Sequence, residues 1–454
     1  MGCDMQVTPY GEFSKDFMVD RLAALCDSEN GVQTGPFGSQ LHQEDYVAVG
    51  TPIVTVEHLG ENRIRHEDVP CVSDEDRDRL SRYQLREGDI VFSRVGSVDR
   101  RALVRKDEDG WLFSGRCLRV RPNNSKIDSA YLSYFFGLPT FKEHIRGIAV
   151  GATMPSLNTQ ILRDVIILHP QDLKEQCAIA HILGTLDDKI ELNRRMNETL
   201  EAMARALFKS WFVDFDPVRA KAEGRDPGLP QPLADLFPDS FEESELGEIP
   251  RGWRVGTFRD VVSISKESEN PLDAPEVEFS HFSIPAFDEN RGPKLEIGEA
   301  IKSLKFRVPA DAVLMSKLNP EIERVWLVDV AITERAVCST EFLVLLAKSL
   351  FGRSFVYNLA RSVDFRRKLQ GLVTGTSKSH QRAQPEAVLN LGTILPSPDI
   401  LDTFEKIVAP LLQGAQVKQR ESRTLAALRD TLLPKLISGE LRVPDAEKLA
   451  ARYT

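Results

Sequence analysis

Basic side chains gather at predicted strand ends of this sequence, where they could bind an anion or the edge of a base. In the first half, Arg94 ends the predicted strand GDIVFSR, and Arg100 and Arg101 follow it. Arg116 lies in a second predicted strand, FSGRCLRVRP, which holds two more arginines. Guanidinium groups bind phosphates and, as forks, the edge of guanine. A solvated strand face would show the same spacing, so both interpretations stay open.

A glycine-rich loop, TGPFGSQLH, precedes these residues in the chain. It offers Thr34, Ser39, Gln40 and His42 as hydrogen-bonding groups and Phe37 as an exposed ring. A functional interpretation places these five side chains at a groove. A tight turn that needs its two glycines is the alternative, and the loop alone favours it slightly.

The second half carries its own candidate contact residues. His281 lies in the glycine- and proline-punctuated loop EFSHFSIPAFDENRGP, and Lys317 ends the predicted strand ADAVLMSK. Lys378, His380 and Arg382 alternate in LVTGTSKSHQRAQPEAV, which we predict to be a contact loop.

Motifs for nucleotide hydrolysis, metal binding and nucleophilic catalysis are missing. The sequence has no GxxxxGK[ST], no HExxH and no nucleophile elbow. Its NPE at Asn319 to Glu321 differs from the NPP[FY] of amino-methyltransferases. We therefore predict no catalytic residue, no metal ligand and no cofactor site in this chain. An enzyme of an unrecognised class is the least favoured alternative.

The composition fits a cytoplasmic protein whose basic character is local. The 454 residues carry a formal net charge of −10, so only local basic patches could attract a polyanion. Six cysteines are scattered without CxxC spacing, which is typical of a reducing compartment. The first residues lack the pattern of a signal peptide, and no apolar run reaches about 18 residues, so no membrane association is expected.

Long amphipathic helices are predicted over residues 173–213 and 399–441, because apolar residues recur there every three or four positions. Pro410 should kink or interrupt the start of the second helix, and Pro434 should kink or end it. Asn193 is the one polar residue in the first apolar stripe and could fix the register of a helix pair. The residues predicted to pair the helices or to bind partner subunits are Ile182, Leu186, Ile190, Leu200, Met203, Leu207, Trp211, Leu425, Leu428, Leu432 and Leu436.

The chain repeats one plan twice, at an offset of about 225 positions. Leu200 aligns with Leu425, and FKEHIRGIAVGAT aligns with FRRKLQGLVTGTS. Such self-similarity indicates a tandem duplication of an α/β unit and a long helix. The predicted parts are an N-terminal segment (1–18), a first globular domain (19–172), the first long helix (173–213), an acidic linker rich in proline and glycine that should be extended (214–250), a second globular domain (251–398), the second long helix (399–441) and a tail (442–454).

Several of these stretches resemble the DNA-specificity subunit of type I restriction–modification enzymes. The most specific match runs from Glu175 to Val218. TGPFGSQLH, REGDIVFSR, LFPDSFEESELGEIPRGW, FSIPAFD and TLLPKLISGEL extend the resemblance over nearly the whole chain. The second globular domain departs from the pattern, because it has the IPAFD loop in place of the TGPFGS loop.

The resemblance implies a mixed α/β fold, with two target-recognition domains separated by an antiparallel pair of long helices and related by pseudo-twofold symmetry. It implies a non-catalytic subunit that reads an asymmetric, bipartite site on double-stranded DNA. Its partners would be two methyltransferase subunits, which use S-adenosylmethionine, and, where the system has them, two restriction subunits, which use ATP and Mg. A coiled-coil scaffold that binds only proteins is the alternative, and the basic loops favour the DNA reader.

Overall fold

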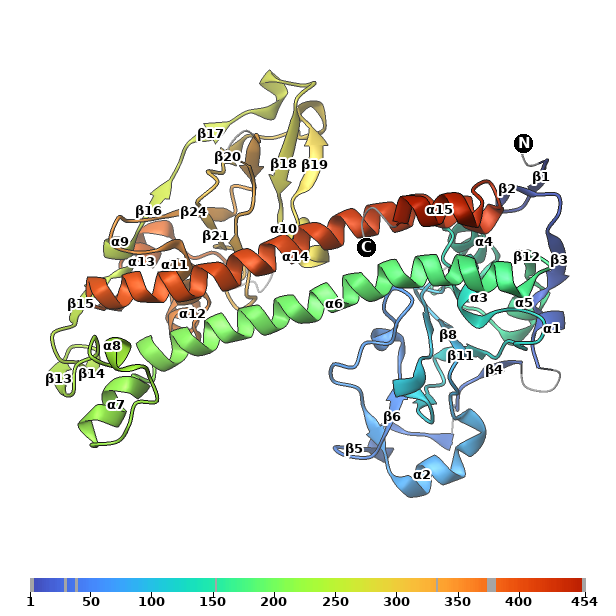
Figure 1. The fold of residues 1–454 in the computed structure, drawn as a ribbon, viewed down its shortest axis with the longest axis horizontal. Helices are drawn as coiled ribbons and strands as arrows, with labels where there is room; N and C mark the ends of the chain where they lie inside the picture. The colour runs from blue at the N-terminus through green and yellow to red at the C-terminus, as the bar shows by residue number, and fades with distance from the viewer. Residues whose placement is uncertain are drawn as a thin grey trace. The chain divides into compact units, whose positions relative to one another are not determined.

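The computed structural model describes residues 4–27, 31–36, 40–151, 153–331, 334–373 and 381–450. These residues form two compact units (Figure 1). Unit 1 comprises Met1–Leu192 and Glu421–Thr454, and unit 2 comprises Asn193–Arg420. Each unit joins a globular α/β part to segments of two long helices, α6 (Leu173–Phe212) and α14 (Pro398–Ser438). The predicted class, a mixed α/β protein with two globular parts and two long helices, is therefore confirmed.

Helices α6 and α14 contain 40 and 41 residues, so each is about 60 Å long. Helix α14 continues through both Pro410 and Pro434, and the prediction that they interrupt or end it was wrong. Both prolines are exposed. Water can therefore satisfy the carbonyl that each proline leaves without its helical partner, while the apolar side of the helix stays packed.

In unit 1, the segments of the two long helices pack antiparallel. Asp187 of α6 pairs with Arg429 of α14 at 2.8 Å, and Lys189 pairs with the earlier residue Glu421 at 3.6 Å. Ile182, Leu186, Leu425, Leu432 and Leu436 are buried in the core of this unit, and Ile190 and Leu428 are partly buried against it.

In unit 2, the two segments again run antiparallel. A Cβ on Gly414 would lie 3.5 Å from Leu200, and the ring centroids of Phe208 and Phe404 are 6.0 Å apart. Trp211 is buried in the core of this unit, Leu207 is partly buried against it, and Leu200 is partly exposed.

Two positions of the predicted stripe behave differently from the rest. The Met203 side chain is 48% exposed, because Ala204 and Phe208 fill the seam. Its prediction as a helix-pairing residue was therefore wrong, which leaves only the predicted role in binding a partner subunit. Asn193 is fully buried, and neither polar atom of its amide has a hydrogen-bond partner among the described residues. The polar position in the stripe thus faces inward.

The centre of unit 1 is an antiparallel four-stranded sheet with the order β4-β11-β8-β9. Its strand IVFS is buried on both faces: Ile90 and Phe92 face the long helices' side of the core, and Val91 faces a second sheet. The strands are β4 (Val32–Thr34), β8 (Ile90–Ser93), β9 (Arg101–Leu103) and β11 (Cys117–Val120), with β10 (Leu112–Phe113), β6 (Thr51–Val54), β7 (Cys71–Val72) and β5 (Tyr46–Val47) in the second sheet, β1 (Met5–Thr8) with β2 (Gly11–Ser14), and β3 (Met18–Arg21) with β12 (Ile166–His169). The helices are α1 (Leu22–Leu25), α2 (Asp74–Arg79), α3 (Ser129–Phe135), α4 (Pro139–Ile148), α5 (Thr159–Asp164) and, near the C-terminus, α15 (Val443–Ala450).

Unit 2 repeats the four-stranded sheet in the order β16-β24-β21-β22, again antiparallel throughout. Its strands are β16 (Val262–Ser265), β21 (Val313–Ser316), β22 (Val325–Leu327) and β24 (Phe342–Ala347), with β17 (Ser268–Glu269), β20 (Lys305–Arg307), β23 (Ala336–Cys338), β18 (Glu278–Phe282) and β19 (Lys294–Ile297) in a five-stranded sheet, β13 (Phe241–Ser244) with β14 (Gly247–Pro250), and β15 (Arg254–Thr257) with β25 (Gly392–Leu395). The helices are α7 (Asp216–Ala222), α8 (Gln231–Ala234), α9 (Phe258–Val261), α10 (Ile284–Asn290), α11 (Arg353–Arg361), α12 (Val363–Gly371) and α13 (Pro385–Leu389). The two copies therefore share their central sheet and differ in the second one.

Two segments predicted to be irregular, and the predicted tail, contain regular secondary structure. The acidic stretch 214–250 forms α7, α8 and the hairpin β13-β14, and Val218 and Phe237 are buried. These few apolar anchors outweigh a composition that favours an extended linker. The predicted loop 278–293 contains β18 and α10, and the predicted tail 442–454 contains α15, whose Ala446 is buried. Within the described ranges, every helix is too short or too polar to cross a lipid bilayer.

Candidate nucleic-acid interface

In unit 1, a basic cluster forms where strand β8 ends. The Arg94 N–H donates to the carbonyl of Arg116 at 2.8 Å, and the Arg94 carbonyl accepts from Leu157 at 2.8 Å. Val95 forms an antiparallel bridge with Ser156. The segment after α4 is therefore fastened beside the two arginines, although in sequence it lies about 60 residues after Arg94 and about 40 after Arg116.

Unit 2 has the same arrangement of backbone hydrogen bonds, here called the backbone frame, at the end of β21. The Lys317 N–H donates to the carbonyl of Glu341 at 3.0 Å, and the Lys317 carbonyl accepts from Ala383 at 2.9 Å. Leu318 forms an antiparallel bridge with Arg382. The equivalent backbone positions of the two units are thus Arg94 and Lys317, Arg116 and Glu341, and Ser156 and Arg382.

The side chains on the unit 1 frame differ in exposure. Arg116 is exposed, whereas Arg94 is half-buried and donates from Nη1 to the carbonyl of Gly115 at 3.2 Å. Thr34 lies on β4, directly opposite Leu118 of β11. The glycine that follows Thr34 cannot carry a side chain, because a Cβ there would lie 2.2 Å from a backbone oxygen. The backbone at Gly35 is thus pressed against Ser114, close to Arg116 in the sequence.

The remaining loop candidates of unit 1 separate. Phe37 and Ser39 lie outside the described residues. Gln40 is held inside the unit, because its Oε1 accepts from the Tyr83 hydroxyl at 2.7 Å. The His42 side chain is exposed and stays a candidate contact.

The two arginines that follow Arg94 in the sequence are used inside the fold. Arg101 is 2% exposed, donates to the Ser133 carbonyl at 2.9 Å and pairs with Glu61 at 3.1 Å. Burial raises the pKa of Glu61, but the charges of Arg101 and Lys142 outweigh it and the net pKa is lowered. This contradicts the prediction that Arg101 contacts DNA, because a buried, paired guanidinium cannot reach a groove. Arg100 is half-buried and donates to a backbone carbonyl of the preceding loop.

In unit 2, the exposed cation of the frame is paired with an acid. Arg382 donates to both carboxylate oxygens of Glu341, and this hydrogen bonding lowers the pKa of Glu341. Lys317 is half-buried. His281 lies in β18 and bonds Glu296 through Nδ1 at 2.6 Å; burial lowers the pKa of His281, although Glu296 opposes the shift. Lys378 and His380 lie outside the described residues.

Sequence reasoning did not identify Ser156 and Glu341 as members of these frames. The signal was available in the repeat, because GATMPSL aligns with the start of GTSKSHQRA. A two-residue insertion in the second copy shifts the alignment before it reaches Arg382. Glu341 was overlooked because an acid does not fit a search for basic contacts.

The globular part of unit 1 is fastened to the long helices by a buried polar network. The Tyr134 hydroxyl of α3 donates to Asp187 Oδ2 at 2.7 Å, and Arg429 of α14 pairs with Asp187 Oδ1 at 2.8 Å. Burial, and next the Asp187 charge, raise the pKa of Tyr134. The neighbouring residue Asp188 pairs with Arg105 at 3.2 Å. These bonds fasten the globular part of unit 1 to the segments of α6 and α14 in the same unit.

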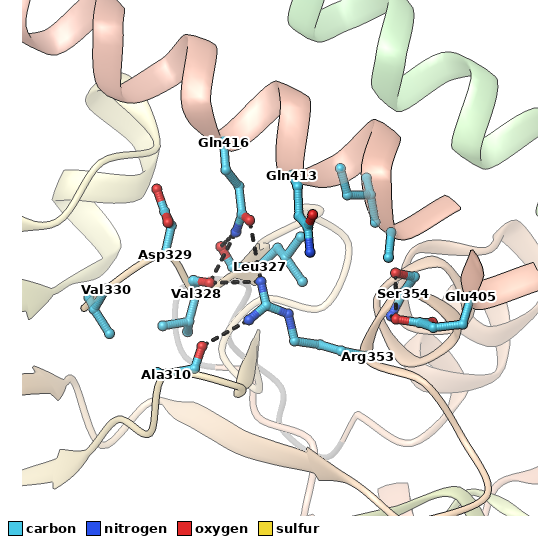
Figure 2. A pocket seen from close by; sticks show the side chains of 12 residues that line it. Ala310, Leu327, Val328, Asp329, Val330, Arg353, Ser354, Glu405, Gln413 and Gln416 are labelled. Carbon is cyan, nitrogen blue, oxygen red and sulfur yellow. Dashed lines mark hydrogen bonds between the residues drawn. The ribbon is translucent and has the colours of Figure 1, made fainter. Parts of the chain in front are cut away.

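In unit 2, the equivalent joint surrounds a cavity of about 310 Å³ between the globular part and α14 (Figure 2). Arg353 donates to the carbonyls of Ala310 and Val328 at 2.8 and 3.0 Å, and Gln416 of α14 donates to Val328 at 3.0 Å. Glu405 of α14 accepts from the N–H and hydroxyl of Ser354. Because both Nη atoms of Arg353 are engaged with main-chain carbonyls, these groups fasten the fold rather than present a ligand site.

Helix α6 is fastened to the same globular part by ion pairs. Arg361 is 5% exposed and pairs with Glu201 of α6 at 3.0 Å and with Glu323 at 2.7 Å. Burial raises the pKa of Glu323, but Arg361 and neighbouring arginines reverse the effect and lower it. Across the described ranges, no group of three or more His, Cys, Asp or Glu side chains is arranged to hold a metal ion.

Comparison with known proteins points to one family. A model of the type I restriction modification DNA specificity domain matches residues 15–202. The type I restriction enzyme MjaIX specificity subunit of Methanocaldococcus jannaschii is 28% identical over 330 residues, which cover 70% of each chain. The HindI specificity subunit of Haemophilus influenzae is 26% identical over 415 residues, covering 79% of this chain and 87% of that protein. The crystal structure of a type I restriction-modification S subunit from M. genitalium is similar in fold, with a TM-score of 0.57 and 15% identity over 92% of this chain and 96% of that one.

Proposed function

This chain belongs to the family of type I restriction–modification DNA specificity subunits, and from that premise we propose that it reads a bipartite, asymmetric DNA sequence. It is a recognition subunit and not an enzyme. The observation that carries the proposal is the pair of backbone frames, one in each unit. Each unit places equivalent backbone positions at the end of its own four-stranded sheet. These positions carry Arg94, Arg116 and Ser156 in unit 1, and Lys317, Glu341 and Arg382 in unit 2.

Equivalent frames with different side chains suit two half-sites with different sequences. Base edges in the major groove are distinguished by the pattern of donors and acceptors that faces them. Two readers with different chemistry therefore select two different half-sites, whereas identical readers would select a palindrome. We propose that unit 1 reads one half of the site and unit 2 reads the other.

The long helices are the proposed docking surface for partner subunits. Met196 and Met203 of α6 are 39% and 48% exposed and lie two turns apart on one face of the helix. Exposed methionines at such spacing are suited to contact a partner helix. We propose two methyltransferase subunits, which use S-adenosylmethionine to methylate adenine, and two ATP- and Mg-dependent restriction subunits in a complete system. The five described cysteines are all free thiols, which supports a cytoplasmic location.

The test is methylation by the chain together with the methyltransferase encoded beside it. The complex should methylate adenines in one bipartite, non-palindromic sequence, mapped by single-molecule sequencing of the host DNA. DNA binding should weaken steeply as salt rises, and competitor DNA without the site should bind about 1,000-fold or more weakly.

A coiled-coil scaffold that binds only proteins makes the opposite prediction. It would assemble with the methyltransferase but show no preferred DNA sequence in either assay. Methylation by the purified chain without any partner would also contradict the proposal, because the recognition subunit is not the catalyst.

A further inference from the structure

The backbone frame of unit 2 carries a bidentate ion pair. Arg382 donates from Nε to Glu341 Oε2 at 2.9 Å and from Nη2 to Glu341 Oε1 at 2.8 Å. The Arg382 side chain is 45% exposed and that of Glu341 is 23% exposed. The acid therefore lies beneath the arginine and holds its guanidinium plane in one orientation.

This geometry leaves the other edge of the guanidinium available. A guanidinium has five N–H donors, and two of the five point to the Glu341 carboxylate. The Nη1 and Nη2 groups still present two parallel donors on the outer edge. That pair matches the O6 and N7 acceptors of guanine in the major groove.

We propose that Arg382 recognises a guanine in the half-site read by unit 2, and that Glu341 is a positioning residue that orients the guanidinium. The inference rests on the proposed function and adds one base and two residues to it. Ordering the arginine before DNA arrives removes part of the entropy cost of binding, since an exposed arginine otherwise samples many rotamers.

The equivalent positions of unit 1 cannot form this pair. Ser156 stands at the position of Arg382, and Arg116 stands at the position of Glu341. The basic group in unit 1 is therefore displaced to the neighbouring strand, and none of its three equivalent positions, Arg94, Arg116 and Ser156, carries an acid. At these equivalent positions, the arginine held by an acid is therefore a feature of unit 2.

Two other roles for the pair lead to different results. Arg382 could bind a phosphate, which would carry no base preference. Glu341 could accept from the amino group of cytosine, with Arg382 only neutralising it. The three roles differ in which substitution changes the base that is preferred.

The experiment uses the complete chain with its methyltransferase partner and a panel of duplexes that carry each of the four base pairs at every position of the mapped site. In Arg382→Gln, one G·C pair in one half-site should lose its preference by about 5- to 150-fold. Glutamine is suited to adenine, so A·T should gain relative to the other pairs at that position. Arg116→Gln, in unit 1, should change only the other half-site.

The positioning role is tested with Glu341→Gln and with the double variant. Glu341→Gln should keep guanine as the preferred base but reduce the preference at that position. The double variant should match Arg382→Gln alone, because an acid that acts through the arginine has no effect once the arginine is gone. Arg367→Gln is the matched control: Arg367 forms an exposed ion pair with Asp364 in the same unit at 3.0 Å, and its loss should leave every base preference unchanged.

Three results would overturn the inference. A uniform loss of affinity in Arg382→Gln, with base preferences intact, would assign the arginine to a phosphate. A switch of the preferred base in Glu341→Gln would assign the acid as the reader. If Arg382→Gln changed the same half-site as Arg116→Gln, unit 2 would be excluded as the site of the contact. Absence of any base preference in the unmodified complex would instead contradict the proposed function itself.

Discussion

Two buried tyrosines on α3 differ in what their hydroxyls meet. Tyr134 donates to the Asp187 carboxylate at 2.7 Å, and Tyr131 donates to the Leu168 carbonyl at 3.0 Å. A hydrogen bond to a charged group contributes about 1.5–3 kcal/mol, and one to a neutral group contributes about 1 kcal/mol. We expect Tyr134→Phe to lower the stability of unit 1 more than Tyr131→Phe does. Urea unfolding followed by hydrogen exchange of α3 measures both, and equal losses would show that the carboxylate partner adds nothing.

The Glu323 carboxylate should make the stability of unit 2 sensitive to acid. Its ordinary pKa of 4.5 is lowered in the folded chain; burial opposes the shift, but Arg361 and its neighbours outweigh it. The stability from this carboxylate is therefore fully present above about pH 4.5 and is lost as the pH falls toward the lowered pKa. Glu323→Gln should flatten the stability profile of unit 2 below pH 4.5 in thermal melts. The exposed residue Glu321 provides the control, and an equal effect of Glu321→Gln would assign the pH dependence elsewhere.

Residue types alone predicted which side chains could bind an anion, but not which of them are available. Arg94 and Arg101 look equivalent in the sequence, yet Arg101 is buried against Glu61 and Ser133. The difference comes from the close approach of α3 and its following turn, where a Cβ on Gly137 would lie 2.3 Å from the Arg101 guanidinium. Such a tertiary contact has no signature in the spacing of arginines.

At the scale of the element, we predict that the long helices set the spacing between the two half-sites. Lys189 of α6 and Glu421 of α14 lie opposite each other, so both helices can be lengthened at the same level. Inserting four residues after Glu191 and four before Glu421 adds about 6 Å and rotates the stripe by only about 40°. Base pairs rise about 3.4 Å each, so the spacer between the half-sites should grow by one or two base pairs.

Methylation mapping of the lengthened chain, expressed with its methyltransferase, measures this spacer. The half-site sequences should stay the same, because the insertions leave the backbone frame of each unit unchanged. Inserting two residues at each point turns the stripes outward by about 200°, and that variant should lose assembly instead of gaining a new spacer. An active four-residue variant with an unchanged spacer would show that the helices do not set the distance.

Elements with a strong period were predictable, and those that depend on a few anchors were not. The repeat of apolar residues every three or four positions predicted the ends of α6 and α14 to within three residues. The stretch 214–250 misled because its acids, prolines and glycines outnumber the side chains that decide its fold. Phe215, Val218 and Phe237 pack into the core of unit 2 and order the whole segment.

At the scale of the whole molecule, unit 2 is continuous in sequence and unit 1 is not. Leu425, Leu432 and Leu436 of α14 are buried in the core of unit 1. Losing one buried leucine costs about 2–5 kcal/mol, and a domain has only about 5–15 kcal/mol of stability. We therefore expect a chain that ends at Arg420 to keep unit 2 folded and to unfold unit 1.

Hydrogen exchange resolved by residue tests this truncation. Amides of β21 and β24 should stay protected, and those of β8 and β11 should exchange freely. Leu436→Ala is the graded comparison, since it should weaken the protection of β8 without abolishing it. Equal protection of β8 in the full-length and truncated chains would show that α14 is dispensable for unit 1.

The duplication itself was readable from the sequence, and so was the class of the fold. The similarity of FKEHIRGIAVGAT to FRRKLQGLVTGTS fixed the offset, and the hydrophobic periods fixed the type of each long element. The second sheets were not predictable, because they differ between the copies in strand number and order. Matching hydrophobic patterns identify what the copies share, and they are silent about what each copy adds.

The divided construction of unit 1 sets an order of events on the ribosome. The first 192 residues are made before unit 2, but the helix segment that completes their core is made after it. At about 5–20 residues per second, roughly 10–45 s of synthesis separate the two, during which unit 2 can finish folding. Translation that stops early would leave one folded unit beside an unfinished one. A reader of both half-sites therefore exists only once the segment that begins at Glu421 has been made.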